Sequence, residues 1–369
     1  LVGTGINIVV KSGEHYGEIF GGSLGEEGHP DKAVISGDSY LHTEANANKD
    51  PLSGNIKFYG GCNLSQVTGN SEVEITHGTF DGAVFGGGKG VSSSTEYGNI
   101  GGNASVLIND GNTKGADVYG GCALGNVKGN TIVDLVGGAV HDVYGGGLGD
   151  ASTAAIVLGN ATVTLNGSTE AGATNDCKVY GSIFGCNNVN GTPKGHALVH
   201  VLNTWEREGQ SDDAYHVPAV YGGGNHAAYQ PSDDDDFAEV LIENCDNSIE
   251  YVYGGGNAAP VPATKVTIKG ADAINHAFAG GNGAGAGNPG ADIGYLNYHS
   301  QGSEETYGTG KSEINVLGGT VNNVYGGSNT LGYIRTHAAV DVPEFPDGYE
   351  PKCDLHLGSV HAGGNQAEM

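Results

Sequence analysis

One short segment of the chain gathers side chains that typically contact sugars. It holds the only tryptophan of the chain, and its candidate ligand-binding residues are Trp205, Arg207, Asp212, Asp213, Tyr215 and His216. An aromatic ring can stack on a sugar, and charged groups can hydrogen-bond its hydroxyls. The segment therefore predicts a glycan-binding loop. The alternative is a loop that packs its tryptophan against the body of the protein.

A run of consecutive carboxylates is the candidate metal site of the sequence. It comprises Asp233, Asp234, Asp235 and Asp236. Oxygen ligands suit a hard cation, so Ca²⁺ is the one cofactor that the sequence suggests. A solvated acidic loop is the alternative. The 14 histidines show no metal-ligand spacing, and we predict no further metal site.

The sequence contains no arrangement typical of a catalytic centre. Glu72 and Glu74 lie two residues apart, and paired carboxylates can act as acid and base in glycoside cleavage. The next repeat offers them no matching basic residue, which favours a solvated strand face. A nucleophile elbow, a phosphate-binding loop and a Cys-x-x-Cys motif are also missing. We therefore predict no catalytic residues and no enzymatic activity.

These segments separate copies of a recurring box, an aromatic residue followed by a glycine pair. Clear copies begin at Phe20, Tyr59, Phe85, Tyr119, Tyr144, Tyr221, Tyr253 and Tyr325, and looser copies begin at Phe184, Phe278 and His361. Repetition at this spacing indicates a repeat architecture. We expect the glycines to supply turns with φ > 0.

Two structural ladders are predicted from the box. If the strand alternation is strict, the aromatic rings face outward; if a bulge occurs at the glycines, the rings are buried. We favour a buried ladder of rings, which includes Tyr59, Tyr119, Tyr144, Tyr221, Tyr253 and Tyr325. Four residues after the aromatic an asparagine often recurs, namely Asn63, Asn225, Asn257, Asn282, Asn329 and Asn365, with Asn187 in a shortened copy. Stacked asparagine amides can hydrogen-bond to one another along a stack of strands.

A second recurring element lies between the boxes, with clear copies at 69–75, 102–108, 129–135 and 159–165. Apolar or small residues alternate with mixed ones, as at Thr131, Val133 and Leu135. A period of two that is rich in β-branched residues predicts a strand with one inward face. Another short strand precedes each box, and in Asp142-Val143-Tyr144 it places the valine inward and the aspartate outward.

The spacing of the boxes limits the fold. Tyr119 and Tyr144 are 25 residues apart, which suffices for a coil of two or three short strands but not for a four-stranded propeller blade. We predict an all-β fold, a right-handed parallel β-helix (solenoid) of about eleven coils with loop insertions, as one domain over 1–369. The handedness follows from the crossover rule. Insertions 167–178 and 203–218 are neighbours, and in the irregular segment 23–56 only Ala33–Ile35 resembles a strand.

Composition narrows the range of partners. The 42 acidic and 15 basic residues give a net charge of −27, which argues against nucleic acid and anionic membranes. No stretch approaches the ~20 apolar residues of a membrane helix.

Six cysteines do not make a disulfide scaffold. Cys62 and Cys122 are predicted to lie too far apart to bridge, and Cys177 and Cys186 could close a local loop. Buried free thiols are the alternative.

The box and the Gly-Asn-x-x-Val-x-Ile strand, as in 69–75, resemble the glycine-rich β-helix surface proteins of bacteria, adhesin-like proteins with Tyr-Gly-Gly-Gly repeats. The resemblance implies an extracellular rod at the bacterial cell surface that presents loops to host surface proteins or glycans, and it transfers no catalytic residue.

The strand pattern reaches both ends and the chain opens at Leu1, so we expect a segment of a longer protein or a subunit that stacks end to end into fibres. The alternatives are a carbohydrate-active enzyme (polysaccharide lyase or glycoside hydrolase) and a non-catalytic glycan-binding module.

Overall fold

The computed structural model describes residues 5–48, 50–169, 172–209, 211, 214–233, 236–284, 291–297, 306–307, 310–342 and 352–367. These residues form strands and turns, and none of them belongs to a helix that could cross a membrane. The predicted all-β class is confirmed. Four predicted site residues lie outside the described part of the chain: Asp212, Asp213, Asp234 and Asp235.

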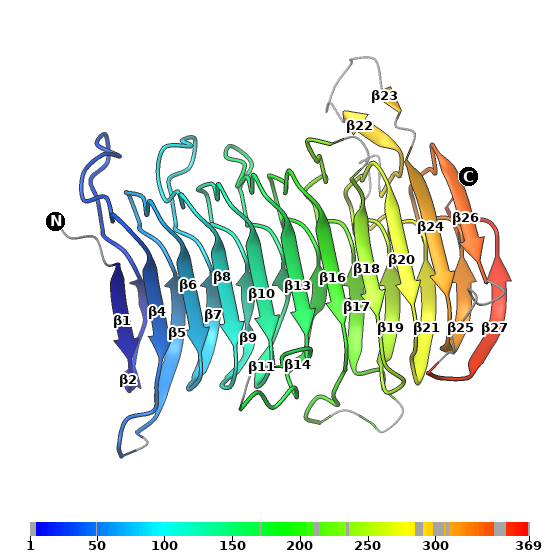
Figure 1. Ribbon diagram of the computed structural model, residues 1–369, viewed down its shortest axis with the longest axis horizontal. Helices are drawn as coiled ribbons and strands as arrows, with labels where there is room; N and C mark the ends of the chain where they lie inside the picture. The colour runs from blue at the N-terminus through cyan, green and yellow to red at the C-terminus, as the bar shows by residue number, and fades with distance from the viewer. Residues whose placement is uncertain are drawn as a thin grey trace.

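Two long sheets of parallel strands make up the body of the protein (Figure 1). The first sheet consists, in spatial order, of β1 (Ile6–Val10), β4 (Ser39–Thr43), β6 (Ser71–Ile75), β8 (Ala104–Ile108), β10 (Thr131–Leu135), β13 (Ala161–Leu165), β16 (Ala197–Val201), β18 (Ala238–Ile242), β20 (Thr264–Ile268), β24 (Lys311–Val316) and β26 (His337–Asp341).

The second sheet consists of β2 (Gly13–Glu14), β5 (Leu52–Tyr59), β7 (Thr79–Phe85), β9 (Asn112–Tyr119), β12 (Val143–Tyr144), β15 (Ser182–Phe184), β17 (Val217–Tyr221), β19 (Ser248–Tyr253), β21 (Ala273–Phe278), β25 (Gly319–Tyr325) and β27 (Leu355–His361). Short strands β3 (Gly17–Phe20), β11 (Ala139–Val140) and β14 (Lys178–Val179) pair beside this path. Apart from both sheets, β22 (Tyr295–Asn297) and β23 (Thr306–Tyr307) form an antiparallel pair.

In-register stacking explains the recurring columns of the sequence. Between β10 and β13, Val133 pairs with Val163 and Leu135 pairs with Leu165, and all four side chains are fully buried. Inward residues of both sheets form one apolar cluster between the sheets. Each coil thus buries its apolar face against the identical face of its neighbour, as expected of a repeat protein.

The N-terminal part is more regular than the sequence suggested. β4 pairs in register with both β1 and β6, although we predicted no strand there. Leu41 fills the central inward position, but Ser39 and Thr43 fill the two flanking ones, and these polar residues hid the pattern. The predicted strand at 33–35 is not formed, since Ile35 makes only an isolated bridge to Val67.

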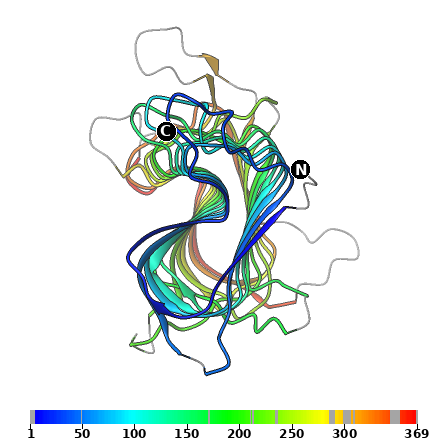
Figure 2. The same ribbon diagram turned by 90° about the vertical axis from the view of Figure 1, so that its left-hand side faces the viewer.

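A third line of parallel contacts accompanies the two sheets. Isolated bridges run from Ile35 through Val67, Ile100, Val127 and Val157 to Pro193, and from Val261 through Ile293 to Ile334. Most of the bridged residues belong to two smaller apolar clusters. Each repeat therefore passes the first sheet, the second sheet and this line in turn, which is compatible with a β-helical solenoid (Figure 2).

The box glycines are required for a reason other than the predicted one. None of them has a positive φ. Instead, a Cβ atom on Gly86 would lie 2.4 Å from the carbonyl oxygen of Gly120 in the next coil, and a Cβ atom on Gly120 would lie 2.4 Å from that of Gly145. The close approach of stacked backbones therefore selects glycine. Ala279 is fully buried at this position, so one coil admits a methyl group.

The disulfide also differs from the one that the sequence allowed. Cys177 and Cys186 are free and buried. The bridge joins Cys245, after β18, to Cys353, before β27, across a sequence separation of 108 residues. It fastens the turn of the last coil to a turn three coils earlier. Gly270, in an intervening turn, leaves room for it, because a Cβ atom there would lie 2.5 Å from the Cys353 sulfur.

Candidate functional site

The box aromatics form one continuous stack along the second sheet. Neighbouring ring centroids lie 4.5–5.0 Å apart, in the order Phe20, Tyr59, Phe85, Tyr119, Tyr144, Phe184, Tyr221, Tyr253, Phe278, Tyr325 and His361. The stack is separate from the cluster between the sheets. Val143 belongs to the inner cluster, whereas Tyr144 belongs to the stack and is 1% exposed. The rings therefore alternate outward and are still buried.

Asparagine amides form a column beside the ring hydroxyls. Side-chain hydrogen bonds of 2.8–3.0 Å link, in order, Asn188, Asn225, Asn257, Asn282, Asn329 and Asn365. The hydroxyl of Tyr253 donates to Asn282 Oδ1 over 3.3 Å and accepts from Asn329 Nδ2 over 3.1 Å. The two ladders are thereby connected, and the box residues serve the scaffold.

Two asparagines lie differently from the prediction. Asn188 begins the column, whereas the buried Asn187 donates from Nδ2 to the carbonyl oxygen of Ala155. Asn63 joins its neighbouring coils through its backbone, donating to Ser23 and accepting from Gly90. The amide column therefore starts in the middle of the chain.

A further ladder, which was not predicted, lies at the start of the first-sheet strands. The side-chain oxygens of Asn70, Asn103 and Asn130 each accept the backbone N–H of the asparagine in the next coil over 2.8–2.9 Å, and Asn160 accepts that of His196 over 2.9 Å. The recurring Gly-Asn pair was the signal. The asparagine side chain accepts a backbone N–H group of the next coil that would otherwise lack a hydrogen-bond partner where the strand begins.

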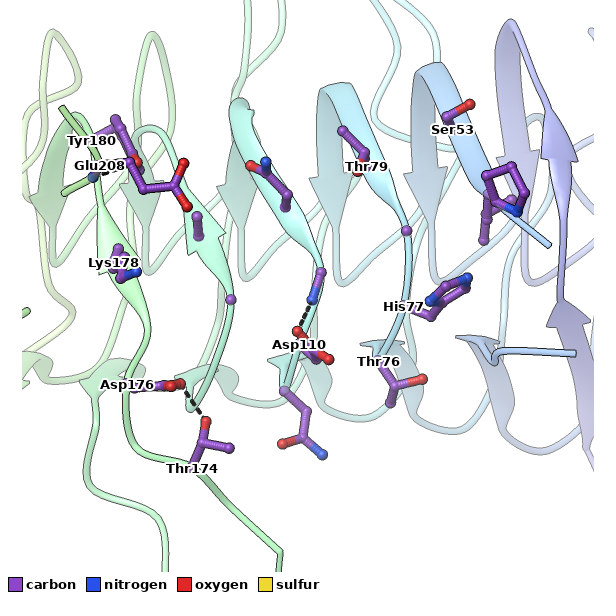
Figure 3. Close-up of a pocket in the computed structure, with 18 of the residues that line it drawn as sticks. Ser53, Thr76, His77, Thr79, Asp110, Thr174, Asp176, Lys178, Tyr180 and Glu208 are labelled. Carbon is purple, nitrogen blue, oxygen red and sulfur yellow. Dashed lines mark hydrogen bonds between the residues drawn. The ribbon is translucent and has the colours of Figure 1, made fainter. Parts of the chain in front are cut away.

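An open groove of about 1020 Å³ runs along the turns that lead into the second sheet (Figure 3). The turn before β7 contributes His77, and the turn before β9 contributes Asp110. The far end holds Asp176, Lys178 and Glu208. Because stacked coils advance by about 4.8 Å, the groove presents polar groups at a regular step. That geometry suits an extended polymer.

The two predicted insertions hold each other at one end of the groove. Trp205 donates from Nε1 to the carbonyl oxygen of Asn175 over 2.7 Å. Arg207 donates to the carbonyl oxygen of Tyr180 over 3.3 Å, and the backbone N–H of Glu208 donates to the Tyr180 hydroxyl over 3.1 Å. The indole is 43% exposed. The hydrogen bonds therefore fix the loops while leaving part of the ring accessible.

The predicted ligand cluster does not converge on one point. The Tyr215 hydroxyl accepts a hydrogen bond from Asn322 over 3.5 Å, and His216 Nδ1 lies 3.1 Å from the Thr204 hydroxyl. Trp205, Arg207, Tyr215 and His216 do not line the groove, whereas Glu208 does. The groove could have been predicted from one repeat position that we did not compare between copies. His77 and Asp110 both occupy it, two residues after the last inward residue of a first-sheet strand.

Ion pairs cross three strands on the outer face of the first sheet. His196 Nε2 and Lys265 Nζ lie 3.0 and 3.4 Å from the two carboxylate oxygens of Glu239. Four residues further along each strand, a second row repeats the pattern with His200, Glu243 and Lys269. The hydrogen bond from His196 is the main cause that lowers the pKa of Glu239, and that from Lys269 is the main cause for Glu243.

The remaining predicted carboxylates are engaged locally. Asp236 lies 3.9 Å from His196 Nδ1, and its backbone N–H donates to the carbonyl oxygen of Asp233. Glu74 accepts a hydrogen bond from the Tyr40 hydroxyl of the preceding coil. None of these three carboxylates lines the groove.

In comparisons with known proteins, no family model, curated protein or solved structure matches this chain.

Proposed function

We propose that the chain is an extracellular structural and adhesive rod that binds an extended glycan along the groove at its turns. The rod would be a right-handed parallel β-helix of about eleven coils. The observation that carries the proposal is the groove itself, which crosses successive coils and is bounded by insertion loops. Its hydroxyl, amide and carboxylate groups are those that hydrogen-bond sugar hydroxyls, and binding faces of repeat proteins often lie where insertions gather.

Several observations support the proposed location and assembly. The Cys245–Cys353 disulfide suits an oxidising environment such as the cell exterior. The similarity of the box to bacterial surface repeats favours the cell surface of a bacterium. Within the described chain, β1 and β26 each pair along one edge only, and unpaired edges can accept a further coil or a second copy. End-to-end association would therefore lengthen the rod, and electron microscopy would reveal it as fibres.

A carbohydrate-active enzyme is the alternative, and the ion-pair rows are where it would be sought. A general acid needs a raised pKa. The pKa of Glu239 and that of Glu243 are lowered instead, and both oxygens of each carboxylate already hold a basic partner. These two rows therefore favour a structural role for Glu239 and Glu243.

A glycan array tests the proposal directly. The unchanged chain should retain neutral or amino-sugar polymers, because the charged lining combines Asp110, Asp176 and Glu208 with a single lysine, Lys178. Asp176→Asn and Glu208→Gln should each weaken binding about 10- to 100-fold, the effect of losing a hydrogen bond to a charged group. The exposed Glu96 lies outside the groove, and Glu96→Gln serves as the matched control.

Two results would contradict this function. An array on which the unchanged chain binds no glycan would leave only the structural role of the rod. Equal binding by both groove variants and by the control would move the binding surface elsewhere. New reducing ends or unsaturated sugars released from a bound polymer would favour the enzyme.

A further inference from the structure

Two carboxylates of the second sheet are stacked on each other. Asp117 lies in β9 and Asp142 directly precedes β12, and the register that pairs Val118 with Val143 brings the two aspartates side by side on adjacent coils. Like charges in neighbouring positions of a sheet are unfavourable. The net charge of −27 makes such an arrangement costlier. A cationic partner would therefore stabilise the pair.

The only imidazole of the group cannot satisfy both carboxylates by itself. His141 Nδ1 lies 3.0 Å from Asp117 Oδ1 and 3.8 Å from Asp142 Oδ2. A ring nitrogen carries at most one hydrogen, so it forms a full hydrogen bond to one of the two oxygens. The three ligand atoms lie within 4.8 Å of one another. Among the described residues, this is the one such group of three side chains with metal-ligating atoms.

Surrounding groups hold Asp142 in the orientation that this cluster needs. Its Oδ1 accepts the backbone N–H of Ser182 over 2.7 Å, which leaves Oδ2 on the side of His141. A Cβ atom on Gly181 would lie 2.1 Å from that Oδ1, so only glycine permits the approach. The Tyr144 hydroxyl donates to Oδ2 over 3.4 Å. Hydrogen bonds of this kind orient the ligands of metal sites.

We propose that Asp117, His141 and Asp142 form a binding site for a divalent transition metal, with Zn²⁺ as the best-fitting ion. Imidazole and carboxylate together suit Zn²⁺, whereas Ca²⁺ takes oxygen ligands. In a tetrahedron with bonds of about 2.0–2.2 Å, ligand atoms lie about 3.3–3.6 Å apart. The separations of 3.0 and 3.8 Å bracket this value. The ion would neutralise the stacked carboxylates and leave its fourth position to water.

Isothermal titration of the EDTA-treated chain with ZnCl₂ tests the site. One strong equivalent should bind to the unchanged chain, and excess CaCl₂ should not displace it. His141→Ala should weaken zinc binding by at least about tenfold, which is the smaller effect known for supporting residues. Asp142→Asn should do the same while preserving the shape of the side chain. His200→Ala is the matched control, since the carboxylate beside His200 is already paired with Lys269.

Circular dichroism of each variant establishes that it is folded before affinities are compared. With Co²⁺ in place of zinc, the intense visible d–d bands of a four-coordinate ion should appear in the unchanged chain and in His200→Ala, and be lost in His141→Ala. The proposal fails if the unchanged chain binds no zinc, or if His141→Ala and Asp142→Asn bind as tightly as it does. It also fails if His200→Ala is weakened equally, or if Ca²⁺ displaces the zinc.

Discussion

Replacing one ring in the middle of the aromatic stack should destabilise several coils. Tyr253 is 2% exposed, and its ring centroid lies 4.7 Å from that of Tyr221 and 5.0 Å from that of Phe278. Removing a large buried side chain costs about 3–5 kcal/mol, and each stacked pair adds about 0.5–1.5 kcal/mol. Since these terms overlap, we expect Tyr253→Ala to lower the free energy of unfolding of the surrounding coils by about 4–6 kcal/mol.

Tyr253→Phe is the matched control, because it keeps the ring and removes only the hydroxyl. That hydroxyl bonds Asn282 over 3.3 Å and Asn329 over 3.1 Å. Two neutral hydrogen bonds contribute about 1–3 kcal/mol in total. The difference between the two variants therefore isolates the contribution of the ring.

Hydrogen exchange measured by mass spectrometry is the suitable assay, because repeat proteins unfold through nearest-neighbour units and one global free energy does not describe them. Peptides that cover β17, β19 and β21 should lose protection in Tyr253→Ala, while those from β4 to β8 should not. If the free energies of unfolding of the alanine and phenylalanine variants differ by less than about 1 kcal/mol, the ring stack does not stabilise the sheets, contrary to this prediction.

Three further predictions concern other ladders and links. Asn257→Ala breaks two amide hydrogen bonds of 2.8 Å. Hydrogen exchange should show that the free energy of local unfolding falls by about 1–3 kcal/mol. A decrease no larger than that of an ordinary surface substitution would contradict a stabilising role of the amide column. Cys353→Ser leaves Cys245 without its disulfide partner and should lower the free energy of unfolding of the last coils by about 2–5 kcal/mol. Limited proteolysis should then cut these coils earlier than in the unchanged chain. An unchanged digestion pattern would argue against the bridge. Burial raises the pKa of Tyr144, so only the unfolded chain ionises this phenol near pH ~10. Stability should then fall as the pH rises above that value. The part of the phenolate absorbance that Tyr144→Phe removes should appear together with the loss of circular dichroism; if that part appears first, the Tyr144 ring is accessible.

Much of the fold could be predicted because each coil is the environment of the next. Val133 repeats at Val163 since both occupy the same inward position in register, and that periodicity is visible in the sequence. The reason for the box glycines was not visible. Gly86 is needed because the carbonyl oxygen of Gly120 lies against it, and a contact between coils leaves no mark on the local φ angle.

The amino-acid sequence by itself determined most of the strands, although not β4, together with their inward faces and the repetition of the box. All of these depend on residues at most one coil apart. Only the tertiary structure decided which groups meet across coils. Cys245 reaches Cys353 over 108 residues, the loop of Glu208 closes a groove begun by the turn of His77, and Asp117 meets His141 and Asp142. The aspartates were visible at the same repeat position, but their neighbour His141 became meaningful only when stacking placed its ring between two carboxylates. Outward side chains such as His141, and those of the inserted loops, do not recur from coil to coil as the inward residues do, so their contacts follow from the path of the folded chain.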